Sequence, residues 1–182
     1  MALAGVSGSG KSRVLQHLFF TPELSALYRV MLTDNPIAML SRRSVLAELS
    51  ASLALGRARG PGSQEWGLPE EWLARSPRTL STGQTKLVAC RCLILQSPDL
   101  LLLEEPFSGL DSQLRATLEA WLRQYLASGG RIIFTTHNPD EMCLYPDVLV
   151  VVDKAAPIWV ASAGEDFNSQ PESRLGTAGF VR

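Results

Sequence analysis

The sequence predicts an α/β fold with a mostly parallel sheet, because its apolar runs and the helices between them follow the pattern of that class. The runs Leu100–Leu103, Ile132–Phe134 and Val148–Val152 lack the polar alternation of half-exposed strands, so they are typical of strands buried on both faces. Predicted helices alternate with these strands, which favours parallel pairing. The length of 182 residues suits one domain, which we expect over residues 1–167.

The first part of the chain predicts a short strand, a glycine-rich loop and a helix. Residues 2–4 are apolar and precede the loop, and a helical run covers 12–20 before the turn signal at Thr21-Pro22. A strand is expected at 28–32 and a helix at 41–55. Residues 56–63, Gly-Arg-Ala-Arg-Gly-Pro-Gly-Ser, must form a loop because glycine and proline disfavour both helix and sheet.

The rest of the chain continues the alternation. Pro69, followed by two glutamates, predicts a short helix over 69–73, because proline in a first helical turn loses no hydrogen bond. Further helices are expected at 82–95, 113–127 and 139–143, and further strands at 100–104, 131–136, 148–152 and 158–160. The polar residues 168–182 are expected to form a loose C-terminal tail.

The loop after the first strand has the spacing of a phosphate-binding P-loop. Its glycines let the backbone wrap a phosphate chain with N–H groups pointing inward, at a helix N-terminus that favours anions. The lysine adds a point charge, and the following serine supplies a hydroxyl that can ligate Mg²⁺. The motif reads Gly5-Val6-Ser7-Gly8-Ser9-Gly10-Lys11-Ser12.

Composition excludes several other classes of function. A net charge of −1 gives no basic surface for nucleic acid, so no nucleic-acid partner is expected. No apolar run approaches the roughly 20 residues of a transmembrane helix, and no signal peptide is recognisable, so a cytoplasmic protein is expected. Cys90, Cys92 and Cys143 do not have metal-ligand spacing and are interpreted as buried apolar residues.

A second motif stands at the start of the helix expected at 82–95. Ser81 is a candidate N-cap, and the amide of Gly83 at the helix N-terminus could donate to a phosphate oxygen. An ordinary capped helix explains these residues equally well when they are taken alone. The sequence Leu80-Ser81-Thr82-Gly83-Gln84 nevertheless resembles the signature of ATP-binding cassette (ABC) ATPases, which is usually Leu-Ser-Gly-Gly-Gln.

Two further stretches extend this resemblance. Residues 100–111, Leu-Leu-Leu-Leu-Glu-Glu-Pro-Phe-Ser-Gly-Leu-Asp, are similar to the family's Walker B strand, catalytic glutamate and D-loop. Adjacent carboxylates at the end of a buried strand can divide metal binding from activation of water. By the resemblance Glu104 is the metal-side residue, Glu105 is the general base, and Asp111 belongs to the nucleotide site.

The last motif is a histidine at the end of a predicted strand. Phe134-Thr135-Thr136-His137 is similar to the family's switch-histidine segment, and His137 is expected near the γ-phosphate. The four motifs occur in the family's order over residues 5–137. The resemblance therefore implies a P-loop NTPase fold with a short inserted helical subdomain, roughly residues 36–95, that carries the signature.

The same resemblance implies a mechanism and its partners. Two cassettes would pair head to tail and clamp ATP with Mg²⁺ between Gly5–Ser12 of one copy and Ser81, Gly83 and Gln84 of the other. Separate transmembrane subunits would contact residues 36–49 and place the chain on the inner face of the membrane. Asp34 stands where the family has a glutamine that faces Mg²⁺.

Several residues depart from the family pattern. Glu104 replaces an aspartate and moves the carboxylate by roughly 1.5 Å, Asp34 cannot donate as an amide does, Thr82 replaces glycine, and Leu87 replaces arginine. The antiparallel strands that usually precede the P-loop, with their adenine-stacking aromatic residue, are not found before Met1, so weak binding of the base is expected.

Three functions remain open from the sequence. The first is an ATPase subunit of an ABC transporter. The second is a soluble ABC ATPase that does not transport. The third is a truncated or degenerate cassette that binds ATP without efficient hydrolysis.

Overall fold

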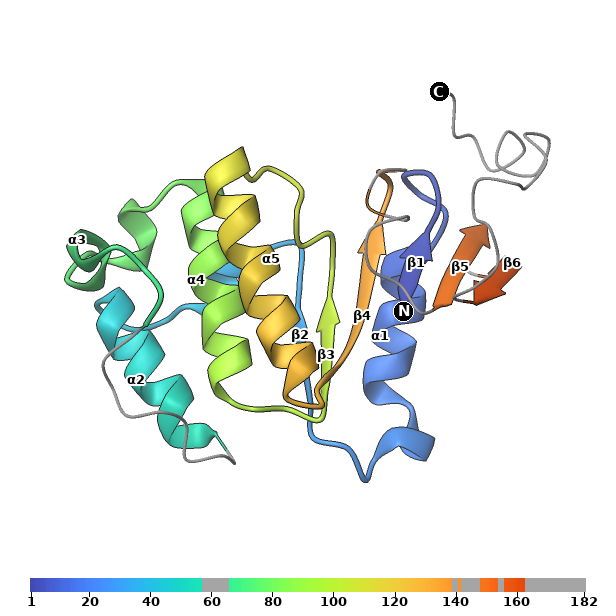
Figure 1. Cartoon of the computed structure of the whole chain (residues 1–182), viewed down its shortest axis with the longest axis horizontal. Coiled ribbons are helices and arrows are strands. Elements are labelled where there is room, and N and C mark those ends of the chain that lie inside the picture. The colour runs from blue at the N-terminus through green and yellow to red at the C-terminus, as the bar shows by residue number, and fades with distance from the viewer. Residues whose placement is uncertain (57–65, 139–140, 142–147, 154–155, 163–182) are drawn as a thin grey trace. The chain divides into compact units, whose positions relative to one another are not determined.

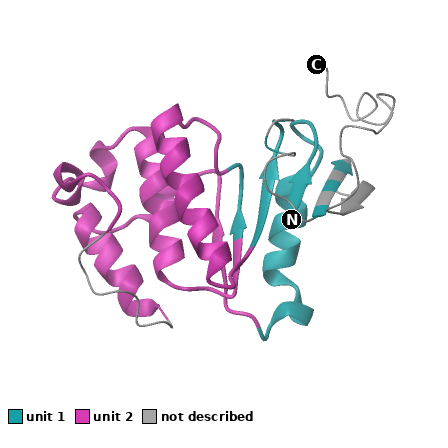
Figure 2. Cartoon of the chain, in the orientation of Figure 1, with its two compact units in different colours: residues 1–26, 102–105, 132–182 teal, residues 27–101, 106–131 magenta. Residues whose placement is uncertain are grey.

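The computed structural model describes residues 1–56, 66–138, 141, 148–153 and 156–162 (Figure 1). The chain divides into two compact units (Figure 2). Unit 1 comprises residues 1–26, 102–105 and 132–182. Unit 2 comprises residues 27–101 and 106–131.

The sheet of unit 1 is built around its first strand. Strand β1 (Ala2–Ala4) lies between β4 (Arg131–Thr136) and β5 (Val148–Asp153) and is parallel to both. Hydrogen bonding on both edges buries β1 completely, to 2% exposure or less. The predicted parallel pairing is thereby confirmed, while Ile132 and Ile133 of β4 are half-buried rather than buried on both faces.

Two further strands lie beside β4 and β5. Strand β3 (Leu100–Leu103) is the neighbour of β4, and all four of its leucines are buried. On the other side β6 (Ala156–Ser162) pairs with β5 in antiparallel orientation, so the sheet is mostly rather than wholly parallel. The strand predicted at 158–160 is therefore longer at both ends.

Helix α1 (Lys11–Phe20) follows the P-loop and buries Leu15 in unit 1. The helix ends at Thr21, because Pro22 disfavours helical geometry in the residue before it and Thr21 is extended. A 3₁₀ turn, η1 (Pro22–Leu24), completes the connection. The turn predicted at Thr21-Pro22 is confirmed.

Unit 2 is mainly helical. It contains β2 (Arg29–Leu32), η2 (Pro36–Met39), α2 (Val45–Leu55), α3 (Glu70–Leu73), η3 (Pro77–Thr79), α4 (Thr82–Leu95) and α5 (Ser112–Ala127). Helix α4 contacts both α2 and α5, and nine of its residues are buried, which makes it the centre of this unit. Leu87, at the position where the family has arginine, is 1% exposed and belongs to this core.

The structure corrects one helix boundary and leaves other predictions untested. The helix expected at 41–55 begins at Val45, because the Ser44 hydroxyl accepts a hydrogen bond from the Ala47 amide and caps the helix there. Of the helix predicted at 139–143, only Glu141 is described, and the tail at 168–182 lies outside the described residues. The domain boundaries remain predictions. None of the described helices is long and apolar enough to cross a bilayer.

Candidate functional site

The glycine-rich loop in unit 1 runs from β1 into α1 and has the backbone of a phosphate-binding loop. Gly10 is the N-cap of α1 with φ 95°, a left-handed conformation that glycine adopts without steric cost. Gly5 also lacks room for a side chain, since a Cβ there would lie 2.5 Å from the Val152 carbonyl oxygen. The strand, glycine-rich loop and helix that the spacing predicts are all present.

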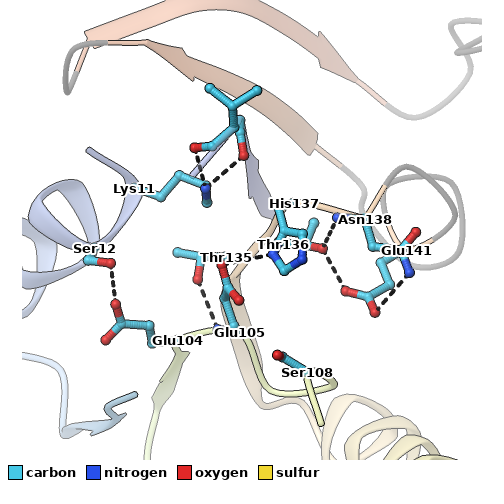
Figure 3. Close-up of polar contacts among 12 residues, drawn as sticks. Lys11, Ser12, Glu104, Glu105, Ser108, Thr135, Thr136, His137, Asn138 and Glu141 are labelled. Carbon is cyan, nitrogen blue, oxygen red and sulfur yellow. Dashed lines mark hydrogen bonds and ion pairs between the residues drawn. The ribbon is translucent and has the colours of Figure 1, made fainter. Parts of the chain in front are cut away.

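Lys11 is folded back onto this loop. Its Nζ donates to the carbonyl oxygens of Gly5 at 2.7 Å and Val6 at 2.9 Å, and the residue is 5% exposed (Figure 3). Burial lowers the pKa of the Lys11 ammonium, while the charges of Glu105 and Glu104 oppose that shift. The P-loop cation is thus held inside the loop and electrostatically coupled to both carboxylates.

The side chain of Ser9 is a buried hydroxyl within the P-loop. Its residue exposure is 3%, and its buried Oγ has no hydrogen-bond partner among the described residues. A buried hydroxyl without a partner is energetically unfavourable, so such a group inside a phosphate-type loop fits a ligand that accepts a hydrogen bond. The residues of this loop therefore fit a phosphate.

The two carboxylates after β3 are placed differently, as predicted for adjacent residues. The Ser12 hydroxyl donates to Oε1 of Glu104, which joins the P-loop helix to the end of β3 (Figure 3). Glu105 turns the other way and pairs with His137, with 3.0 Å between Oε1 and Nδ1. Unit 1 therefore brings together four of the predicted site features: the P-loop, Glu104, Glu105 and His137.

The backbone of Glu105 has an unusual conformation. Its φ is 41°, in the left-handed region that residues with a side chain rarely adopt. Its amide donates to Oγ1 of Thr135 at 2.9 Å. Thr135 was not predicted as a functional residue. The available signal was its position near the end of a predicted strand, two residues before His137.

The residues after β4 are tied together by a second threonine. The Thr136 hydroxyl donates to Glu141 Oε2 at 2.6 Å and accepts from the Asn138 amide at 2.9 Å. Thr136 is 1% exposed and Glu141 is 6% exposed. These bonds fix the backbone on both sides of His137. Sequence reasoning assigned no role to either Thr136 or Glu141.

In unit 2 the signature residues begin α4. Ser81 Oγ accepts from the Gln84 amide at 3.2 Å, and Gln84 Oε1 accepts from the Ser81 amide at 3.0 Å, which is a complete capping box. The prediction that Ser81 is an N-cap is confirmed. Within α4, Gly83 is packed so closely that a Cβ would lie 3.0 Å from the Gly109 carbonyl oxygen.

Two other predicted residues also lie in unit 2. Asp111 caps α5 by accepting from the amides of Gln113 and Leu114 at 3.0 and 2.9 Å. Asp34 is exposed after β2. The roles of Asp34, Ser81, Gly83, Gln84 and Asp111 toward nucleotide or metal remain predictions. Lys86 adds a link that was not predicted, because its Nζ donates to the Ser108 carbonyl at 2.7 Å and joins α4 to the loop before α5.

Comparisons with known proteins identify the family. The chain is 32% identical over 170 residues to the aliphatic sulfonates import ATP-binding protein SsuB of Mycobacterium sp., with 84% of this chain and 67% of that protein covered. The chain belongs to the ATP-binding cassette family. The resemblance to ABC ATPases seen in the sequence and the predicted α/β P-loop fold class are thereby confirmed.

Other relatives agree with this assignment. The cassette is 32% identical to the sulfate/thiosulfate import ATP-binding protein CysA of Xylella fastidiosa, over 92% of this chain and 56% of that protein. It is 28% identical to the energy-coupling factor transporter ATP-binding protein EcfA2 of Lactobacillus johnsonii, over 93% of this chain and 70% of that protein. The cassette thus spans about half the length of CysA.

Solved structures share the fold of the cassette. A nucleotide-free ATP-binding cassette from an ABC transporter matches with a TM-score of 0.74 and 19% identity, covering 100% of this chain and 87% of that one. A dimeric post-hydrolysis cassette bound to ADP and Pi matches with a TM-score of 0.69 and 18% identity, covering 88% and 84%. Residues 70–142 also match the family model described as "AAA domain, putative AbiEii toxin, Type IV TA system".

Proposed function

We propose that this cassette binds Mg·ATP at its P-loop and hydrolyses it as the nucleotide-binding subunit of an ABC transporter. The observation that carries the proposal is the pair of contacts made by adjacent carboxylates in unit 1. Glu104 meets the P-loop hydroxyl of Ser12, and Glu105 meets His137. A metal-side residue and a base residue are thereby separated at the end of one strand.

ATP is proposed to bind through its phosphates. The amides of the loop, the Lys11 ammonium and the buried Ser9 hydroxyl would donate to phosphate oxygens. The unpartnered Ser9 Oγ supports this role directly, because an accepting oxygen would remove its unfavourable state.

Mg²⁺ is proposed to be held by Ser12 and Glu104, with Asp34 as a further predicted residue. The described residues contain no cluster of three or more His, Cys, Asp or Glu side chains that could hold a metal alone. Mg²⁺ in phosphate sites takes only one or two protein ligands together with waters and phosphate oxygens, so the small donor set fits this ion. When bound, the ion would neutralise charge on the phosphate oxygens.

Glu105 is proposed to act as the general base. Its carboxylate would accept a proton from water while the water oxygen bonds to the γ-phosphorus and the bond to the β,γ-bridging oxygen breaks, giving ADP and phosphate. His137 would orient the Glu105 carboxylate and contact the γ-phosphate. The 3.0 Å separation of their side chains supports the first of these two roles.

The proposal also covers assembly and transport. A second cassette would supply Ser81, Gly83 and Gln84 to the nucleotide, with Asp111 nearby, and transmembrane subunits would be separate chains. The relatives support this part of the proposal, since they are import and energy-coupling factor transporter ATP-binding proteins. The cassette would then act at the cytoplasmic face of a membrane.

The test is an ATPase assay of the purified cassette and two glutamate variants. Glu105→Gln removes the proposed base, and we expect a loss of turnover of about 10²-fold or more with Mg·ATP binding retained. Glu119→Gln is the matched control, since Glu119 pairs with Arg115 within α5, and should leave turnover unchanged. Equal turnover in wild type and Glu105→Gln would refute the enzymatic proposal.

The same assay separates the two alternative functions. Binding of Mg·ATP with no turnover by the wild type would favour a cassette that senses nucleotide. The longer side chain of Glu104, whose carboxylate accepts a hydrogen bond from Ser12, is the observation consistent with it. Turnover without co-purification of any membrane subunit would favour a soluble ABC ATPase that does not transport.

A further inference from the structure

Strand β4 holds Glu105 at two points. Thr135 contacts the backbone of Glu105, and His137 contacts its carboxylate (Figure 3). Thr135 belongs to β4, and His137 directly follows Thr136, the last residue of that strand. One end of one strand thus sets both the main chain and the side chain of the proposed base.

The backbone contact is needed because the conformation at Glu105 is unfavourable by itself. A φ of 41° is rare for a residue with a side chain and persists only where neighbouring groups hold it. The Glu105 amide finds its acceptor in Thr135 Oγ1 at 2.9 Å. This bond fixes the Glu105 amide against β4.

Thr135 is itself rigidly placed. The residue is 0% exposed and lies opposite Leu3 in the register of β1 and β4. Its β-branched side chain has restricted rotamers in a strand, so the hydroxyl has little freedom to move. A fixed acceptor of this kind can hold the amide of Glu105 in the left-handed conformation.

We propose that Thr135 is a positioning residue for the base, and that its hydroxyl sets the direction of the Glu105 carboxylate through the backbone. The inference rests on the proposed role of Glu105 in hydrolysis. Thr135 touches neither ATP nor water in this scheme. Its loss should therefore lower kcat without weakening nucleotide binding.

The test compares three single variants of the full chain. Thr135→Val keeps the shape and removes the acceptor, Thr135→Ser keeps the acceptor, and Tyr125→Phe removes a different buried hydroxyl, which donates to the Pro98 carbonyl at 2.8 Å within unit 2. We expect kcat to fall by about tenfold or more in Thr135→Val, since small displacements of catalytic groups are costly. Thr135→Ser should recover most of the rate, Tyr125→Phe should leave kcat unchanged, and KM should be unchanged in all three variants.

Two further measurements exclude a merely structural effect. In a Glu105→Gln background, Thr135→Val should cause no additional loss of kcat, because the group that it positions is already absent. Amide hydrogen exchange at Glu105, measured without nucleotide, should accelerate in Thr135→Val and stay unchanged in Tyr125→Phe. An unchanged kcat, an equal loss in both backgrounds or unchanged exchange at Glu105 would overturn the inference.

These outcomes are distinct from a failure of the proposed function. A wild-type cassette that binds Mg·ATP without turnover would refute hydrolysis, and with it the role of Thr135 in positioning a base. The exchange measurement would still decide whether the Thr135 hydroxyl holds the backbone of residue 105.

Discussion

The Nδ1 atom of His137 lies 3.0 Å from Oε1 of Glu105, so the proposed base and the proposed switch residue contact each other directly within unit 1. Both side chains are partly exposed, at 54% for His137 and 32% for Glu105. Partly exposed pairs of this kind are screened by water and bind each other weakly. The pair can therefore separate at little cost when a phosphate competes for either partner.

The first prediction concerns His137. His137→Ala removes the contact to Glu105, so we expect kcat to fall by about tenfold to a hundredfold, the range for a misplaced catalytic group. Loss of the proposed contact to the γ-phosphate should lower ATP affinity by a smaller factor. Steady-state ATPase kinetics and an equilibrium binding assay measure the two effects. His17→Ala, which changes the exposed histidine of α1, is the control. A wild-type rate in His137→Ala would contradict a role for His137 in hydrolysis.

The second prediction concerns Lys11. Lys11→Met keeps the length of the side chain but removes the ammonium, so we expect ATP affinity to fall by about tenfold to a hundredfold, as for loss of a charged hydrogen bond. Titration with a fluorescent ATP analogue measures the affinity. Arg13→Met, which removes a cation from an exposed position of α1, should bind ATP like the wild type. Unchanged affinity in Lys11→Met would show that the P-loop does not bind the phosphates.

The third prediction separates the structural role of Ser81 from its proposed role toward nucleotide. Ser81→Ala breaks the capping box at the start of α4, and we expect the free energy of unfolding to fall by about 1 kcal/mol. Thr82→Ala, at the exposed neighbouring position, should be nearly neutral. Chemical denaturation measures both variants. If Ser81→Ala lowers ATP turnover by more than its stability loss explains, the residue has a further role in the assembled dimer.

The fourth prediction concerns the two described cysteines. Burial raises the pKa of Cys90 and of Cys92 to about 12, so both thiols should resist alkylation in the folded protein at neutral pH. The pKa of each thiol in the folded protein lies above the ordinary 9.0. The protonated thiols therefore make their full contribution to the free energy of unfolding below pH 9.0, and this contribution is lost as pH rises toward about 12. Mass spectrometry after iodoacetamide treatment measures the labelling, and rapid labelling of either thiol would contradict the burial.

Local patterns in the sequence predict most of the fold. Glycine spacing places the P-loop, and unbroken leucines place β3, because these signals depend on neighbouring residues alone. The start of α2 is missed because Ser41 and Ser44 are both plausible caps. Only the structure shows which hydroxyl meets a helix amide, and Ser44 makes that bond.

The contacts of Thr135 and Thr136 could not be predicted in the same way. Whether the Thr135 hydroxyl meets Glu105 depends on β3 lying beside β4, and no local pattern gives the order of strands in a sheet. The bond from Thr136 to Glu141 depends on the path of the chain after β4. Both positions read as ordinary strand threonines until the fold brings their partners close.

At residue 105 the left-handed backbone lowers the stability of the fold, while the glutamate side chain is needed for the proposed activity. Glycine would relieve the steric cost of φ 41°, which is about 1 to 2 kcal/mol for a residue with a Cβ. A glycine there would provide no carboxylate to accept a proton from water. Screens that select for thermal stability alone should therefore enrich Glu105→Gly, a more stable variant that no longer has the proposed general base.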